Sequence, residues 1–295
     1  MNEMLRQILG NVGWFGKLLQ LAIVAILFLV IGFFIWNVAG GDAENIQSQK
    51  ILQLLSSIFF FLFPALFLGY FWYKNPISSF YLDALPTLKQ AIWVVLLMVS
   101  IQPFINLLSQ FNQQIHLPVA LSDMERAFQL AENRAEELTK QLLEVDSVWG
   151  YLFNILLMAI LPAVCEELMF RGAVQNIFSE KFSKIGAIWI TAVIFSLIHF
   201  QMYGFFPRML LGALFGYLLV WTKTLWLPIL AHFVNNGMAV SVSYFANDNN
   251  QLNRLDELGK TDTLIFGIAG AVISIFILWK IYKSSKKSIL IKTVE

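Results

Sequence analysis

Charged residues are scarce in this chain. Its 295 residues include 20 Lys and Arg and 19 Asp and Glu, so that 13% are charged, about half of the proportion that is usual in a soluble domain. Hydrophobic residues make up 58%, which is more apolar surface than a soluble core could bury. A net charge of +1 provides no field that would attract nucleic acid. The composition therefore predicts a protein of the lipid bilayer with no nucleic-acid partner.

Cysteine is nearly absent as well. Cys165 stands alone, which excludes a disulfide within the chain and any metal site built on thiolates only. Beside two glutamates it could act as a nucleophile, but a small buried packing residue is the more common case. The first apolar run also lacks a small-residue cleavage site, so we interpret it as a retained span rather than a signal peptide.

The chain does contain a series of long apolar runs, which its few charges separate. A membrane-spanning helix needs about 20 mainly apolar residues. On this criterion we predict an all-α fold, a polytopic membrane helix bundle of about eight transmembrane helices. The predicted spans are Leu18 to Ala39, Ile51 to Tyr73, Ala91 to Leu108, Val148 to Phe170, Ile185 to Tyr203, Phe205 to Thr222, Leu225 to Ala246 and Leu264 to Tyr282. The fifth to seventh follow one another so closely that one of them could be a broken or re-entrant helix.

Tryptophan and the basic residues indicate how the spans are placed. Most Trp residues lie near a predicted span end, where the indole ring meets lipid and its N–H meets water. With both termini on the inner side, most of the 20 Lys and Arg residues fall in inner segments, including the Lys-rich C-terminal tail. We therefore expect a cytoplasmic C-terminus, in an integral protein of a bacterial cytoplasmic (inner) membrane.

One connecting segment, Ser122 to Asp146, is rich in charge. Ser122 and Glu125 have the spacing of a capping box, and the apolar residues that follow recur at roughly helical spacing. The pattern predicts an amphipathic helix that lies on the membrane or over the bundle. It could cover or gate a site, or it could be a solvated connector.

Ionisable residues inside a span cost about 2.5–3.5 kcal/mol each on insertion scales, so their positions are informative. Glu166, Glu167 and Arg171 close the fourth predicted span. Glu167 and Arg171 are four residues apart, share a helix face and can pair, whereas Glu166 lies about 100° further round the helix. The group is either a charge pair at an interfacial helix end or a site in which one carboxylate is held while the other faces a different cavity.

Two of the three histidines also fall in predicted spans. Phe195 and His199 lie four apart in an apolar segment, and His232 and Asn236 lie four apart in another. Each group alone is more often a hydrogen-bonded contact between helices. Together with two carboxylates they favour hydrolysis, because a carboxylate and an imidazole can take a proton from water while an imidazole and an amide can stabilise an oxyanion. A bis-histidine haem site is the weaker alternative.

The three motifs, EExxxR, FxxxH and HxxxN in successive spans, resemble those of the CPBP family. That family contains the type II CAAX prenyl endopeptidases and the bacterial Abi proteins. The resemblance covers roughly Val148 to Ala246. It implies three segments: N-terminal spans with an amphipathic extramembrane helix (1–147), a catalytic membrane core (148–246), and a C-terminal span with a basic tail (247–295).

The resemblance implies an intramembrane endopeptidase that hydrolyses peptide bonds of a membrane-associated or C-terminal substrate segment. Glu166 with His199 would activate water, and His232 with Asn236 would form the oxyanion hole. Glu167 and Arg171 would order the site, with Arg171 also able to grip a substrate carboxylate, and Phe195 would shape the pocket.

Two questions stay open at the level of the sequence. Glu166, His199 and His232 could bind zinc, although no HExxH motif supports this independently, and a glutamate-activated water without a metal cofactor is the favoured alternative. A non-catalytic immunity or scaffold protein could also retain the fold. In either case the expected partners are the lipid bilayer and a peptide or protein at the membrane.

Overall fold

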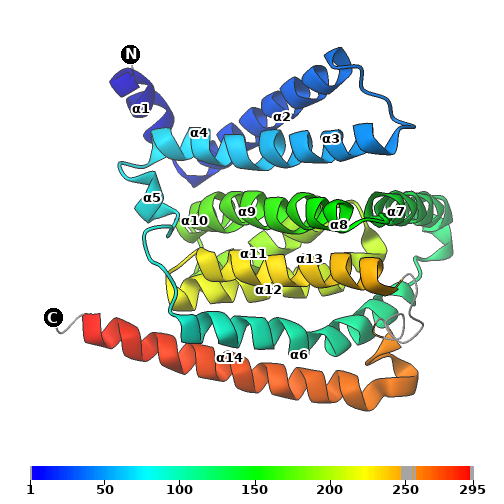
Figure 1. The fold of residues 1–295 in the computed structure, drawn as a ribbon. Helices are drawn as coiled ribbons and strands as arrows, with labels where there is room; N and C mark the ends of the chain where they lie inside the picture. Colours follow the sequence, from blue (N-terminus) through cyan, green and yellow to red (C-terminus); the bar gives the residue numbers. More distant parts are fainter. Residues whose placement is uncertain (1, 247–254, 256, 293–295) are drawn as a thin grey trace.

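The computed structural model describes residues 2–246, 255 and 257–292 of the chain. Helices account for nearly all of these residues, and no strand occurs among them. Figure 1 shows the long helices running side by side, and the first helix begins on the same side of the bundle on which the last helix ends. The predicted all-helical, polytopic bundle is therefore confirmed.

The helices follow the order of the predicted spans. Each segment that crosses the bundle is called a pass. The short helices α1 (Asn2–Gly10) and α5 (Pro76–Ser79) lie before and after the first two passes, and α7 (Ser122–Leu143) is not a pass. The passes are α2 (Trp14–Val38), α3 with α4 (Ile46–Ser56, Phe63–Trp72), α6 (Leu88–Gln113), α8 to α10 (Val148–Asn154, Leu161–Glu167, Gln175–Ser179), α11 (Lys184–Leu197), α12 (Phe205–Thr222), α13 (Trp226–Ala246) and α14 (Leu264–Lys292).

Six of these passes are long and apolar enough to cross a membrane, with mean hydropathy between 1.4 and 3.0. The other two predicted spans correspond to α11, which has 14 residues, and to α13, whose 21 residues include the polar HxxxN segment. At 1.5 Å per residue α11 is about 21 Å long, shorter than the hydrocarbon core of about 30 Å. We therefore expect the turn after α11 to lie within the membrane.

Polar caps explain where several passes begin. Asn45, Thr87, Ser147 and Ser183 each accept a hydrogen bond from a backbone N–H in the first turn of α3, α6, α8 and α11. Such bonds satisfy donors that have no partner within the helix. The starts of these passes are therefore encoded locally in the sequence.

π-helical turns keep two passes continuous. Ser57–Leu62 joins α3 to α4, and Ile155–Ile160 joins α8 to α9. Each is followed by a proline in the next turn, Pro64 or Pro162, whose missing N–H interrupts the α-helical hydrogen bonds. A third turn, Leu168–Val174, has no proline and lies beside Glu166 and Glu167. π-Turns are frequent at functional sites.

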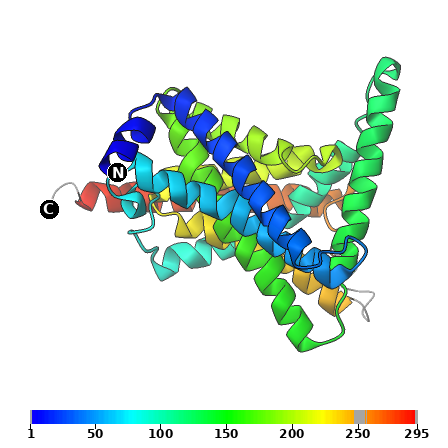
Figure 2. The same ribbon diagram turned by 90° about the horizontal axis from the view of Figure 1, so that it is seen from above.

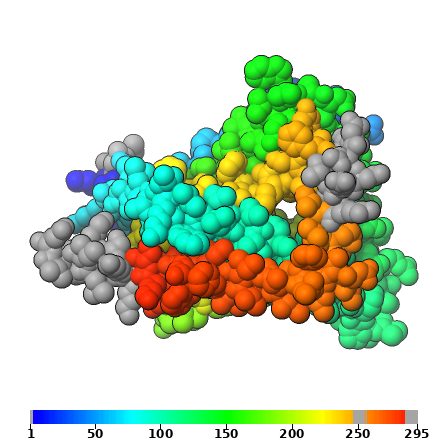
Figure 3. Space-filling model, turned by 60° about the horizontal axis from the view of Figure 1, so that its bottom comes forward, coloured from blue at the N-terminus to red at the C-terminus, as the bar shows by residue number. Residues whose placement is uncertain are grey.

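Burial divides the bundle into a centre and a lipid-facing periphery. In the most apolar 18-residue stretch of each helix, half of the residues of α12 are buried but only 17% of those of α2. α12 packs against α11, α13 and α6, while α6 and α14 lie side by side across one face (Figure 3). Peripheral side chains such as Phe34 and Ile265 are 66% and 74% exposed, as expected for contact with lipid tails.

The predicted amphipathic segment forms α7 (Ser122–Leu143). In Figure 2 α7 runs across one end of the bundle rather than along it. The capping box expected at Ser122 and Glu125 is wrong: the 3₁₀ turn Val119–Leu121 precedes the helix, Leu121 takes the N-cap position, and no side chain caps it. Glu125 instead places its carboxylate 2.8 Å from Nδ1 of His116.

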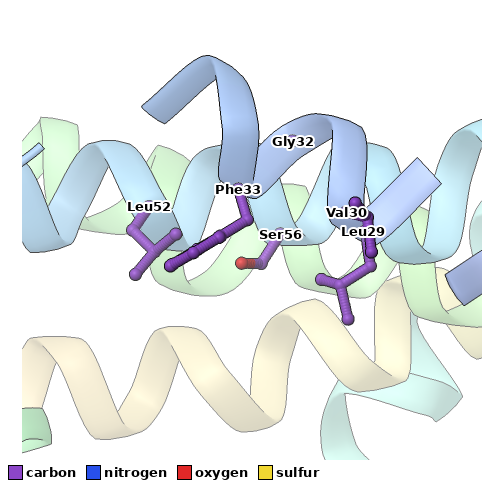
Figure 4. A pocket seen from close by; sticks show the side chains of 6 residues that line it. All are labelled: Leu29, Val30, Gly32, Phe33, Leu52 and Ser56. Carbon is purple, nitrogen blue, oxygen red and sulfur yellow. The ribbon is translucent and has the colours of Figure 1, made fainter. Parts of the chain in front are cut away.

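A shallow apolar groove lies between α2 and α3 (Figure 4). Its lining side chains come from the two helices, and Ser56 is the one polar member. The lining residues are Leu29, Val30, Gly32, Phe33, Leu52 and Ser56. None of these residues is ionisable, so the groove offers no group for acid–base chemistry. We interpret it as a gap in the packing of two lipid-facing helices.

A buried polar contact ties α3 to α8. Lys50 is 4% exposed, and its Nζ donates to Oδ1 of Asn154 over 3.0 Å. The amide of Asn154 donates in turn to the carbonyls of Leu142 and Leu143 at the end of α7. Asn154 therefore links three helices at the end of the bundle that α7 covers.

Replacing Asn154 with Leu is expected to lower the free energy of unfolding by about 1–3 kcal/mol, because the Lys50 ammonium stays buried without its acceptor. Lys50→Met removes the charge together with the bond and should cost less. Thermal unfolding of the detergent-purified variants measures both effects. The double variant should be less destabilised than the sum of the single ones; simple additivity would show that the contact does not couple α3 to α8.

Candidate active site

Most residues of the predicted site line one cavity of about 400 Å³. Its walls come from α6, α9, α11, α12, α13 and the segment between α11 and α12. The lining residues are Ile105, Asn106, Ser109, Glu166, Phe195, His199, Gly204, Pro207, Arg208, Leu211, Phe215, His232, Asn235 and Asn236. Of the predicted residues, Glu166, Phe195, His199, His232 and Asn236 therefore share one cavity, while Glu167 and Arg171 lie behind its wall.

Glu167, Arg171 and His232 form a buried polar network. Arg171 Nη1 donates to Glu167 Oε1 over 2.8 Å, and neither side chain is exposed to any measurable extent. Arg171 Nη2 donates to the carbonyl of Gly212 over 2.8 Å. Gly212 is also packed closely against α11, because a Cβ there would lie 3.1 Å from Phe195. The pairing that the i, i+4 spacing allowed is present, and it leaves Arg171 no exposed surface from which to contact a substrate.

His232 joins this network through one ring nitrogen. Its Nδ1 lies 2.9 Å from Glu167 Oε1. A carboxylate paired with arginine is ionised and only accepts, so Nδ1 carries the proton. Nε2 then points the other way, 4.0 Å from Glu166 Oε2. His232 can accept a proton or a hydrogen bond at Nε2, and it can donate there only as an imidazolium.

Glu166 is the carboxylate that faces the cavity. It is 9% exposed, and its Oε2 is buried with no hydrogen-bond partner among the described residues. The distance of 4.0 Å to His232 Nε2 is too long for a direct hydrogen bond, and one water molecule can bridge two polar groups at such a separation. Glu166 is thus placed to hold a water against an imidazole.

The position of His199 differs from the prediction. It was expected inside an apolar helix, but α11 ends at Leu197 and the chain turns at Phe200, whose φ is +54°. His199 Nδ1 lies 2.7 Å from the carbonyl of Phe195; a carbonyl only accepts, so Nδ1 is protonated and Nε2 is the free acceptor. Neither ring nitrogen lies within 4.0 Å of a Glu166 oxygen, so their expected partnership is not a direct contact.

Asn236 is oriented by a chain of amides. Its Nδ2 donates to the carbonyl of Met158 over 3.3 Å, and its Oδ1 accepts from Asn235. Asn235 accepts in turn from Nε2 of Gln102 on α6 over 3.1 Å. Because the Met158 carbonyl can only accept, the whole chain has one consistent orientation. The second N–H of Asn236 is left to a group in the cavity.

Five polar residues at the cavity were not anticipated from the sequence. Asn106, Ser109, Arg208 and Asn235 line the cavity, and Gln102 contacts Asn235. Asn235 lies within the HxxxN motif, and Arg208 lies within a predicted span, where the cost of a charge was a usable signal. Gln102 had no such signal, since an uncharged amide in a span is common in helix contacts.

The residues suggested for zinc do not form a ready metal site. Among the described residues no group of three or more His, Cys, Asp or Glu side chains is arranged to hold a metal ion. Nδ1 of both histidines is engaged, by Glu167 and by the Phe195 carbonyl, so that Nε2 is the nitrogen of each ring that could bind a metal. Cys165 is buried and free, as expected for a packing residue.

A buried carboxylate and two imidazoles thus lie around one cavity inside a helical membrane bundle. Residues 148–238 match the family described as "Type II CAAX prenyl endopeptidase Rce1-like". The match confirms the resemblance to the CPBP family over the part of the chain that carries all three motifs.

A curated relative points the same way. "Putative membrane peptidase YdiL" of Bacillus subtilis (strain 168) is 29% identical over 107 residues, which are 36% of this chain and 43% of that protein. The match thus spans less than half of the relative's length. No solved structure matches the chain.

Glu167→Gln is expected to destabilise the protein by about 3–5 kcal/mol, because Arg171 would keep its buried charge without a partner. Glu166→Gln should leave stability near that of the wild type, since Glu166 has no such partner. The two variants differ by one position and by the same chemical change, so each controls for the other. Equal thermal midpoints in detergent would contradict a central structural role of the Glu167–Arg171 pair.

Proposed function

We propose that this protein is an intramembrane endopeptidase that cleaves membrane-associated or C-terminal peptide segments. The observation that carries the proposal is Glu166, a cavity-facing buried carboxylate whose Oε2 lies 4.0 Å from an imidazole nitrogen. The Rce1-like match over residues 148–238 supports the same activity. A prenylated C-terminal tail is the substrate chemistry that the family description suggests.

In the proposed reaction Glu166 takes a proton from a bound water as the water oxygen attacks the peptide carbonyl carbon. His199, which presents a free acceptor at Nε2, helps to orient that water. The tetrahedral intermediate collapses, the carbon–nitrogen bond breaks, and the proton passes from Glu166 to the leaving amine. The products are a carboxylic acid, which keeps the second proton of the water, and an amine, so no redox partner is needed.

The oxyanion is proposed to be stabilised by Asn236 and His232. Asn236 can offer its second N–H to the cavity, as its other N–H is held by Met158. His232 can donate at Nε2 only when protonated, and the adjacent Glu167 carboxylate would then serve as its counter-ion. The role proposed for His232 therefore depends on Glu167, which holds Nδ1.

Glu166→Gln is expected to abolish cleavage of an internally quenched peptide that ends in a farnesylated Cys-Val-Ile-Met tail. The amide has nearly the same shape as the carboxylate but cannot accept the proton. The assay uses purified protein in detergent, and Glu136→Gln on the outer helix α7 serves as the matched control. Wild-type turnover by the Glu166 variant would overturn the water-activation role.

The same assay with a chelator tests whether turnover depends on zinc. Incubation with 1,10-phenanthroline followed by its removal should leave turnover unchanged if glutamate activates the water directly. Loss of turnover that returns with added zinc would instead favour a metal at Glu166, His199 and His232.

Asn236→Ala is expected to lower kcat by roughly 10²–10³, the effect typical of one lost oxyanion donor. Gln102→Leu leaves Asn236 in place but removes the last donor in the amide chain, so a smaller loss in kcat with little change in KM is expected. Steady-state kinetics on the farnesylated peptide measures both. A Gln102 variant that changes KM alone would show that the amide chain does not position Asn236.

We also propose that the protein resides in a bacterial cytoplasmic membrane with its C-terminus in the cytoplasm. The Lys-rich C-terminal tail supports this orientation.

A further inference from the structure

Arg208 is a charged residue of the cavity that the proposed reaction does not use. It lies in the first turns of α12 and lines the same cavity as Glu166, His199 and His232. Its guanidinium is seated over Gly204, where a Cβ would lie 3.0 Å from Nη2. The absence of a side chain at Gly204 therefore leaves the space that the arginine head occupies.

The hydrogen bonds of Arg208 are all to neutral groups. Nη2 donates to Oε1 of Gln201 over 2.7 Å, and Nη1 donates to the Gln201 carbonyl over 3.4 Å. A guanidinium has five N–H donors in a fork that fits a carboxylate. Most of those donors thus have no protein acceptor among the described residues.

No carboxylate of the described residues lies within 4.0 Å of Arg208. Glu132 of α7 is near enough for its pKa to respond: burial raises the pKa of Glu132, while the N–H of Tyr203 and the charge of Arg208 act against that rise. Oε2 of Glu132 accepts a hydrogen bond from the backbone N–H of Tyr203 over 3.3 Å. Glu166, which lines the same cavity, also interacts with the charge of Arg208, but at more than 4.0 Å. Arg208 therefore has two carboxylates at longer range and lacks the close counter-ion that a half-buried cation needs.

The contrast with Arg171 is informative. Arg171 is fully buried, paired with Glu167 and bonded to the Gly212 carbonyl. Arg208 lies one helical turn before Gly212 on α12 but turns its head into the cavity. Of the two arginines at the site, Arg171 completes the protein's own network, while Arg208 has donors left for a bound molecule.

We propose that Arg208 is a substrate-binding residue that holds a carboxylate of the peptide being cleaved. This inference rests on the proposed endopeptidase function and adds a determinant of its specificity. A carboxylate bound by the Arg208 fork supplies the missing counter-ion. It also fixes the peptide chain relative to Glu166. The carboxylate can be the free C-terminus of the peptide or an acidic side chain near it.

Binding to an inactive protein tests this separately from turnover. The probe is a dansyl-labelled peptide ending in farnesylated Cys-Val-Ile-Met, made as the free acid and as the C-terminal amide. A second amide carries Glu in place of the final Met. Anisotropy in a non-ionic detergent, which offers no lipid phosphate, measures affinity for Glu166→Gln protein with and without Arg208→Gln. If the wild-type protein does not cleave the peptide, the proposed function fails while the binding comparison stays valid.

In the Glu166→Gln protein we expect amidation to weaken binding by about 10- to 100-fold, the range typical of one charge-assisted contact. In the Glu166→Gln/Arg208→Gln protein the free acid should bind no better than the amide. If only the Glu-containing amide shows the Arg208-dependent gain, the carboxylate comes from a side chain and the proposal stands. A carboxylate preference that is equal in both proteins, or no gain in either protein from the free C-terminus or from the Glu side chain, overturns it.

Two further variants keep the test independent of folding. Arg208→Lys preserves a charge at the position but not the fork, so it should retain only part of the preference for the free acid. Arg134→Gln removes an exposed positive charge from α7 and should leave binding unchanged. Thermal midpoints identify any variant whose loss of binding reflects unfolding.

Discussion

The buried pair of Glu167 and Arg171 is the interaction on which the rest of the site depends. Both side chains are removed from solvent, in a region where an uncompensated charge is costly. Their pairing fixes the ionised state of Glu167, which sets the tautomer of His232. It also joins the π-turn Leu168–Val174 to α12 through the Gly212 carbonyl. One ion pair thus orders a helix contact, an imidazole and the wall of the cavity.

The cost of placing polar groups in lipid made much of this site predictable. Glu166, Glu167 and His232 could be identified as candidate site residues because an ionisable side chain is costly inside a membrane span. Glu167 and His232 are also each followed, four residues later, by a polar residue on the same helix face. The i, i+4 relation of Glu167 and Arg171 was sufficient to predict their contact. The long apolar runs likewise predicted the bundle and most of its passes, because a bilayer leaves few alternatives to the helix.

Other features depend on contacts between distant segments and could not be read from local patterns. The end of α11 at Leu197 places His199 in a turn, although the apolar run continues past it. Its Nδ1 bond to Phe195 keeps it out of direct contact with Glu166. The orientation of Asn236 is set by Gln102 from a helix that carries no motif. Spacing along the chain predicts which residues share a face, but not which neighbouring helix completes their hydrogen bonds.

The burial of Glu166 has a consequence for the shape of a substrate in the proposed reaction. Glu166 is only 9% exposed, and the peptide groups of an α-helix are surrounded by side chains that make the helix about 10–12 Å across. For the proposed cleavage, the peptide segment that reaches Glu166 would therefore have to give up its internal hydrogen bonds at that point. Ease of local unwinding, as much as side-chain identity, would then decide which membrane peptides are cleaved.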